Sequence, residues 1–196
     1  MCGEKEMRTL RLEKKGLRGL AIAESFRQDS KESILAGVVM RRDFVIDGFV
    51  FGRATIEGDD ATDAILDMYK KIDRPDISFI LTSGLIISMY NIIDLKRLCQ
   101  VVGIPAIGVT FEESFGIEDA IKHHFPDSFS SKIEKYQKLG NRKKITLQSG
   151  YDVYVRSEGC QFVDVKHLLD DLTIQGAVPE PLRVAHLLAN VVLQEF

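Results

Sequence analysis

The first third of the chain contains three apolar runs rich in β-branched and aromatic residues. They cover residues 19–24, 34–41 and 44–56. Runs of this length and composition are typical of strands. Only Arg42 and Asp43 separate the second run from the third, a length that suits a hairpin. The sequence therefore predicts three strands, the second and third of them antiparallel.

The pattern changes to helical spacing after residue 59. The apolar positions of this segment fall on one side of a helix: Ala64, Ile65, Met68, Tyr69 and Ile72. A short apolar strand is predicted next over 77–81, a helix over 91–102 and a further strand over 106–110. Helices that alternate with strands imply that these strands are parallel to one another.

The last third is mainly helical. Residues 116–139 have helical spacing in two pieces, which Pro126 divides. A second hairpin and two final helices are expected, with strands over 143–148 and 152–156 and helices over 163–172 and 181–193. We expect one α/β domain over residues 1–196. Its mixed sheet has three antiparallel strands first, then parallel strands joined by helices, an order typical of the ribonuclease-H-like fold.

Composition says more about the cellular compartment of the protein than about its function. The net charge of −3 provides no overall attraction to phosphate, so nucleic-acid binding would need a local basic patch. The three cysteines are widely spaced and form no Cys-x-x-Cys, which argues against a disulfide framework and a structural zinc. The charged N-terminus and the absence of a long apolar run predict a cytoplasmic protein that has no membrane contact.

Two separated segments resemble endonuclease V. Residues 75–109 contain a Pro-Asp before an apolar strand and an Ile-Gly-Val after it, and residues 178–189 contain the Pro-Glu-Pro start of a helix. The resemblance is closer to a group of archaeal proteins known as endonuclease dU. It includes the Asp47-Gly48 pair, Asp60-Ala61-Thr62 and Asn91-Ile92-Ile93-Asp94, and it spans nearly the whole chain.

The resemblance implies a phosphodiesterase that depends on Mg²⁺ or Mn²⁺. Hard cations of this kind prefer carboxylate ligands, and they both activate water and stabilise charge on phosphate. The two firmest ligand positions of the pattern are changed, because Ala23 and Ser83 stand where aspartates are expected. The family pattern leaves Glu24, Asp60 and Asp63 as candidate catalytic residues and Glu24, Asp59 and Asp60 as candidate metal ligands.

Each of these carboxylates also has a structural interpretation. Asp59 and Asp60 precede a helix, where acidic side chains cap the helix and interact favourably with its dipole. Asp63 is typical of a solvated surface. Glu24 would reach a metal only if a β-bulge redirected it, and otherwise it faces solvent at a strand end. Asp94 is expected to cap the helix that follows it.

A basic segment is the candidate nucleic-acid contact. Residues 131–144 contain six cationic side chains around Tyr136: Lys132, Lys135, Lys138, Arg142, Lys143 and Lys144. Such a segment can contact a phosphate backbone, although a lysine-rich helix is often simply a solvated face.

Three hypotheses remain open. The chain is an active metal-dependent nuclease with a rearranged carboxylate site, a catalytically degenerate domain that binds nucleic acid, or an interaction scaffold. The third hypothesis includes a homodimer formed through an exposed strand edge. Loss of two carboxylates disfavours the first hypothesis, and the net negative charge counts modestly against the second.

Overall fold

The computed structural model of the protein describes residues 7–14, 16–113, 116–127 and 129–195. Its first three strands are β1 (Arg18–Ser25), β2 (Glu32–Arg41) and β3 (Ile46–Thr55). They form an antiparallel meander, as the apolar runs predicted. β2 is buried along almost its whole length because it lies between two strands and under helices on both faces.

The middle of the chain alternates helices and parallel strands. These elements are α1 (Ala61–Ile72), β4 (Ile77–Ser83), α2 (Leu95–Val102) and β7 (Ala106–Thr110). β4 pairs in parallel with β1 on one side and with β7 on the other. The expected helix over 91–102 is wrong at its start. Asn91–Ile92 forms β6 instead, which pairs with β5 (Ile86–Ile87) in a small hairpin ahead of α2.

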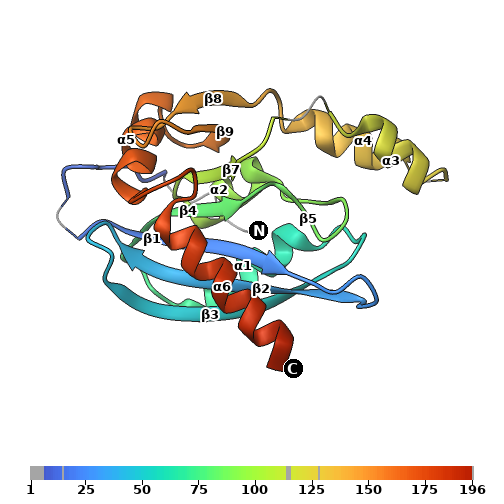
Figure 1. The fold of residues 1–196 in the computed structure, drawn as a ribbon, viewed down its shortest axis with the longest axis horizontal. Coiled ribbons are helices and arrows are strands. Elements are labelled where there is room, and N and C mark those ends of the chain that lie inside the picture. The colour runs from blue at the N-terminus through green and yellow to red at the C-terminus, as the bar shows by residue number, and fades with distance from the viewer. Residues whose placement is uncertain (1–6, 15, 114–115, 128, 196) are drawn as a thin grey trace.

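The remaining elements are α3 (Glu118–His124), α4 (Phe129–Lys138), β8 (Lys143–Thr146), β9 (Asp152–Glu158), α5 (Phe162–Leu172) and α6 (Glu180–Glu195). Pro126 separates α3 from α4, as the sequence predicted. The β8–β9 hairpin joins the main sheet, because β9 pairs antiparallel with β7. In Figure 1, α3 and α4 extend from one end of the sheet as an arm.

The seven-stranded sheet has the order β3-β2-β1-β4-β7-β9-β8. Helices cover both faces. α1 and α2 pack on a core that includes Leu20 and Ile22 of β1, whereas Ala21 and Ala23 face α5 and α6. Figure 1 shows α6 crossing the sheet over β1 and β2. None of the described helices is long and apolar enough to traverse a bilayer.

Candidate functional site

The carboxyl ends of β1, β4 and β7 meet at one edge of the sheet, where the family pattern would place metal-binding aspartates. Ile22 lies beside Thr82, and Ser83 lies beside Val109. Because side chains alternate along a strand, Ala23, Ser83 and Val109 face the same side of the sheet. Ala23 packs with Val38, Met40 and Ala185 in an apolar cluster. This row of side chains provides one neutral hydroxyl and no carboxylate.

Glu24 points to the opposite face of the sheet. β1 and β2 keep a regular register through Glu24 and Leu35, so no bulge redirects the side chain. Its carboxylate accepts hydrogen bonds from the Ser88 backbone N–H, at 2.8 and 3.0 Å, and from the Ser88 hydroxyl, at 2.7 Å. The expectation of a solvent-facing glutamate is therefore wrong, because Glu24 anchors the β5–β6 turn.

That turn has an uncommon backbone. Ser88, Met89 and Tyr90 have φ values of 45°, 55° and 71°, which place three consecutive side-chain-bearing residues in the left-handed region. Such residues persist only where surrounding contacts hold them. Glu24 supplies one contact, and the Glu57 N–H supplies another by donating to the Ser88 carbonyl at 2.7 Å. The C-terminal end of β1 and the loop before α1 together hold the turn in this conformation.

Asp60 is hydrogen-bonded at the start of α1. Its carboxylate accepts from the Thr55 N–H at 3.0 Å, from the Thr55 hydroxyl at 2.6 Å and from the Asn91 amide at 2.6 Å. Burial acts to raise the pKa of Asp60, but these hydrogen bonds together lower it. The capping bond to the Ala61 N–H comes instead from the Asn91 side chain, at 3.0 Å. Asp60 occupies the N-cap position without capping the helix through its side chain.

The other two aspartates before and within α1 pair with basic side chains. Asp63 forms two hydrogen bonds with Arg97, at 2.6 and 3.0 Å, and this contact lowers the pKa of Asp63. Asp59 lies 2.9 Å from the Lys135 ammonium and 3.5 Å from that of Lys132. All four candidate carboxylates thus have donors within the protein.

These donor sets do not fit a divalent metal. Within the described part of the chain, no group of three or more histidine, cysteine, aspartate or glutamate side chains is placed to hold a metal ion. Glu24 and Asp60 belong to separate hydrogen-bond networks, with Ser88 and with Thr55 and Asn91. A Mg²⁺ or Mn²⁺ site at the strand ends would lack the oxygen ligands such ions require.

Lys132 is a structural lysine. Its side chain is almost fully buried, and its ammonium donates to the carbonyls of Glu57, Gly58 and Tyr90 at 2.9–3.2 Å. It also lies 4.7 Å from the centre of the Phe125 ring. Lys132 therefore fastens α4 to the loops beside α1 and β6 and presents no charge to a ligand.

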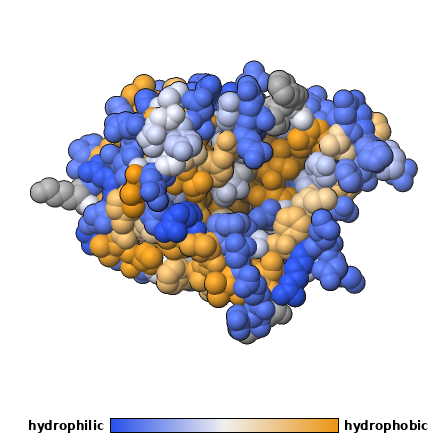
Figure 2. Space-filling view, in the orientation of Figure 1, coloured by the Kyte–Doolittle hydropathy of each residue, from blue (hydrophilic) through white to orange (hydrophobic). Residues whose placement is uncertain are grey.

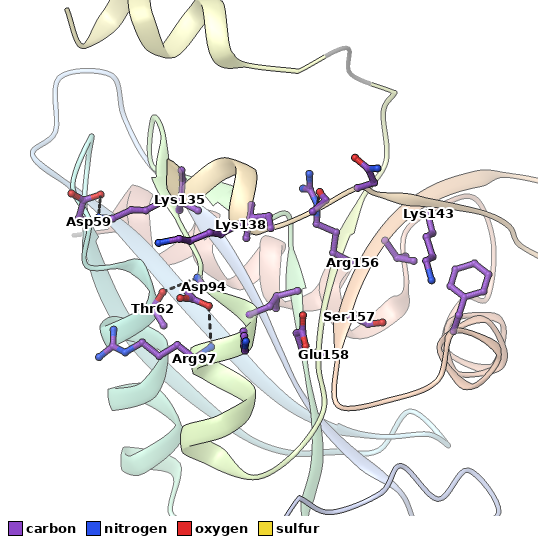
Figure 3. A pocket seen from close by; sticks show the side chains of 18 residues that line it. Asp59, Thr62, Asp94, Arg97, Lys135, Lys138, Lys143, Arg156, Ser157 and Glu158 are labelled. Carbon is purple, nitrogen blue, oxygen red and sulfur yellow. Dashed lines mark hydrogen bonds and ion pairs between the residues drawn. The ribbon is translucent and has the colours of Figure 1, made fainter. Parts of the chain in front are cut away.

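Three other lysines of the basic segment line a pocket of about 480 Å³ between α2, α4 and β9. Figure 3 shows Lys135 and Lys138 along one wall, with Thr62, Asp94 and Arg97 below them. Arg156 and Glu158 of β9 form the opposite side, and Lys143 lies at the far end. The pairing of β8 with β9 ends opposite Val155. Residues 156–158 of β9 therefore extend beyond β8, and there they line the pocket.

The pocket has a positive lining in a protein of negative net charge. Its basic side chains are Lys96, Arg97, Lys135, Lys138, Lys143 and Arg156, and its acidic ones are Asp59, Asp94 and Glu158. Asp94 accepts from the Arg97 N–H at 2.9 Å and caps α2, as the sequence predicted. Burial lowers the pKa of Arg156, which donates to the Gly140 carbonyl at 2.7 Å. Arg97 pairs with Asp63, Lys135 with Asp59 and Lys138 with Glu134. Among the described residues, the lining cations without an ion pair are therefore Lys96, Lys143 and Arg156, and these favour an anionic ligand.

The last two cations of the segment lie outside this pocket. Arg142 donates to the Thr110 hydroxyl at 3.3 Å and to the Glu112 carbonyl at 3.2 Å. It lines a second hollow at the ends of β4 and β7, together with Ser83. Lys144 pairs with Asp152 at 2.7 Å. The segment therefore divides into one buried lysine, three pocket lysines and two cations elsewhere.

Sequence patterns did not identify Asn91, Arg97 or Arg156 as residues of these sites. Arg97 and Arg156 are far from residues 131–144 in sequence, and only the packing of α2 and β9 beside α4 brings them to the pocket. Asn91 belongs to a motif that carried the resemblance to endonuclease dU, which was the one available signal. Its buried side chain joins β6 to the start of α1.

Solved structures place the chain in a known class. The sheet, with its strand-end edge and surrounding helices, is shared with endonuclease V, a ribonuclease-H-like fold. The Bacillus subtilis enzyme matches with a TM-score of 0.64 and 13% identity, covering 98% of this chain and 86% of that chain. A protein of unknown function from Archaeoglobus fulgidus matches with a TM-score of 0.78 and 23% identity, covering 90% of this chain and 98% of that chain.

Sequence comparison then gives the particular family. Residues 15–193 match the family described as endonuclease dU, and the chain belongs to that family. A UPF0215 protein from Pyrobaculum calidifontis is 37% identical over 172 residues, which cover 87% of this chain and 94% of the relative. A UPF0215 protein from Thermoplasma volcanium is 30% identical, with 97% of both chains covered.

Proposed function

We propose that this protein binds a nucleic-acid backbone in the pocket between α2, α4 and β9, and that it does not cleave nucleic acid through a metal at the strand ends. The observation that carries the proposal is the pocket lining, six basic against three acidic side chains in a chain of net charge −3. Phosphate contacts by lysine and arginine supply most of the affinity of non-specific nucleic-acid binding.

The family and fold support a nucleic-acid ligand rather than a free anion. Endonuclease V from Ciona intestinalis was crystallised with DNA that contains inosine, and it matches this chain with a TM-score of 0.62 at 14% identity. Within the pocket, Lys143 has no carboxylate partner in the described chain and lies 5.2 Å from the centre of the Phe162 ring. Phe162 is partly buried against the core, so Lys143 offers phosphate pairing from a position that the ring helps to fix.

The proposal that cleavage is lost rests on the donor sets. Ala23 and Ser83 replace two carboxylates, and Glu24, Asp60 and Asp63 already accept hydrogen bonds from protein donors. A rearranged metal site would have to break these networks. The free thiols of Cys99 and Cys160 agree with a reducing cytoplasmic setting, which we also propose; Cys2 lies outside the described residues.

Fluorescence anisotropy with labelled single-stranded DNA and RNA tests the binding proposal. The triple variant Lys135→Glu, Lys138→Glu and Lys143→Glu should lose most of the affinity. For a single strand, each lost phosphate contact lowers the slope of log K against log salt by about 0.7. The matched control is Lys144→Glu, which reverses a charge in the same segment but outside the pocket. Equal affinity of the triple variant and the control would refute this location.

Calorimetry and cleavage assays test the proposal that the protein does not cleave nucleic acid through a metal at the strand ends. We expect the wild-type protein to show no carboxylate-dependent binding of Mn²⁺ or Mg²⁺ and no metal-dependent cleavage of deaminated or undamaged strands. Restoring two carboxylates with Ala23→Asp and Ser83→Asp should give a melting temperature that rises when Mn²⁺ is added, provided that circular dichroism shows a folded chain. Metal-dependent cleavage by the wild-type protein that Glu24→Ala abolishes would overturn the proposal.

A further inference from the structure

The edge strand β3 carries an apolar surface. Five apolar side chains on β3 or in the turn before it are exposed: Phe44, Val45, Ile46, Phe49 and Phe51. In Figure 2, apolar surface runs along the lower margin of the molecule, where Figure 1 places β3. The largest contiguous apolar patch on a monomer typically covers about 300–600 Å² and is often functional, and larger patches mark interfaces.

The cover provided by α6 ends at β2. Val38 of β2 is fully buried in the cluster that α6 covers through Ala185. Phe49 is the cross-strand neighbour of Val38, and it is 49% exposed. Phe51 is 41% exposed beside Ala36, which is fully buried. On this face of the sheet, the side chains of β2 are thus buried and those of the adjacent strand β3 are exposed.

The backbone edge of β3 is also open. At one end the Asp47 carbonyl accepts from Arg74 at 3.0 Å, and at the other the Thr55 carbonyl accepts from Asn91 at 2.9 Å. Between residues 48 and 53, β2 is the only described element that hydrogen-bonds to the β3 backbone. Natural edge strands are often protected by lysine, proline or a β-bulge. β3 has no lysine or proline, and its one irregularity in pairing lies at Asp47, outside residues 48–53.

We propose that β3 pairs with β3 of a second copy of this chain, antiparallel about a two-fold axis at Val50. This register places Phe49 of each copy opposite Phe51 of the other, and cross-strand aromatic pairs stabilise a sheet. The two charged residues of β3 are already neutralised, Asp47 by Arg18 at 2.5 Å and Arg53 by Glu32 at 3.1 Å. An antiparallel pair therefore brings no unpaired like charges together.

The exposed apolar side chains supply about half of the area of a standard dimer interface. A phenylalanine buries about 150–250 Å², so the exposed parts of the five side chains amount to roughly 400 Å² per copy. A standard interface buries about 800 Å² per partner. Backbone atoms of the two paired β3 strands would add to this area. A dimer would form one continuous sheet, and no residue that lines the basic pocket belongs to β3.

Sedimentation velocity of the full chain tests the proposal. The wild-type protein should sediment as a dimer at tens of micromolar, and Phe49→Lys with Phe51→Lys should sediment as a monomer with unchanged circular dichroism. The matched control is Val163→Lys with Ile174→Lys, which adds the same charge at side chains that are 61% and 62% exposed elsewhere. This control should remain dimeric.

A disulfide test checks the register. The variant Phe49→Cys with Phe51→Cys should form a covalent dimer on mild oxidation, because directly opposed residues of antiparallel strands approach within disulfide range. The wild-type protein is the control for its own three cysteines. A wild-type monomer at these concentrations, or a dimer that survives both lysine substitutions, would overturn the proposal.

Discussion

Glu24 holds Ser88 by two groups at once, the backbone N–H and the hydroxyl, with contacts of 2.7–3.0 Å. Ser88 is buried, and its hydroxyl also lies 2.6 Å from that of Ser33. The Glu24 carboxylate therefore has a structural role. Glu24 joins the end of β1 to a left-handed turn whose other polar contacts come from Ser33, Glu57 and Lys132.

Replacing Glu24 should therefore reduce stability. Glu24→Ala leaves the buried Ser88 N–H without its acceptor, while the Ser88 hydroxyl keeps Ser33 as a partner, and hydrogen bonds to charged groups contribute about 1.5–3 kcal/mol. We expect a loss of this size in the free energy of unfolding by urea, with Glu24→Gln less affected. Glu32→Ala is the control, because its exposed ion pair with Arg53 contributes at most about 1 kcal/mol. A Glu24→Ala protein as stable as the control would contradict this role.

Asp60 should make stability depend on acid pH. Burial acts to raise the pKa of this carboxyl, but hydrogen bonds from Thr55 and Asn91 lower it overall. A pKa lower in the folded state than in the unfolded chain contributes stability above the unfolded value, about 3.9, that is lost as pH falls through the folded value. Urea unfolding of wild-type protein and Asp60→Asn should therefore differ at neutral pH and converge below pH 4. A constant difference across this range would exclude the ionised carboxylate as the cause.

Lys132 should control the attachment of the α3–α4 arm. Lys132→Met retains the apolar stem but leaves the carbonyls of Glu57, Gly58 and Tyr90 without their donor. We expect a loss of about 2–3 kcal/mol and faster amide hydrogen exchange in α4 and in the loops it contacts. Lys135→Met removes an exposed ion pair from the same helix and should alter exchange little. Similar exchange in the two variants would show that Lys132 does not fasten the arm.

Cys160 should react slowly with alkylating reagents. Burial raises the pKa of its thiol to about 11. At pH 8 such a thiol is only about 0.1% thiolate, against roughly a tenth for a cysteine with the ordinary pKa of 9.0, and the thiolate is the reactive form. Iodoacetamide labelling followed by mass spectrometry should be about a hundredfold slower at Cys160 than at a free thiol, and should accelerate about tenfold per pH unit up to pH 10. Rapid labelling at pH 7 would contradict this expectation.

The sequence by itself determined the order of the elements and the class of fold. Apolar runs, helical spacing and the short connection at Arg42 and Asp43 are local properties, and they correctly predicted the first meander, the parallel strands and the break at Pro126. The start of α2 was missed because Asn91 and Ile92 continue an apolar pattern that suits a helix. Their pairing with Ile86 and Ile87 depends on a turn that a distant residue, Glu24, holds in place.

Only the tertiary structure decided which charged residues line the pocket between α2, α4 and β9. Lys132 and Lys135 are three positions apart on one helix and have the same chemistry, yet one is buried against three carbonyls and the other lines a pocket. Likewise, Arg97 and Arg156 reach that pocket from distant parts of the chain. The physical reason is that burial and charge pairing depend on which elements pack together, and residue spacing along one segment does not specify those neighbours.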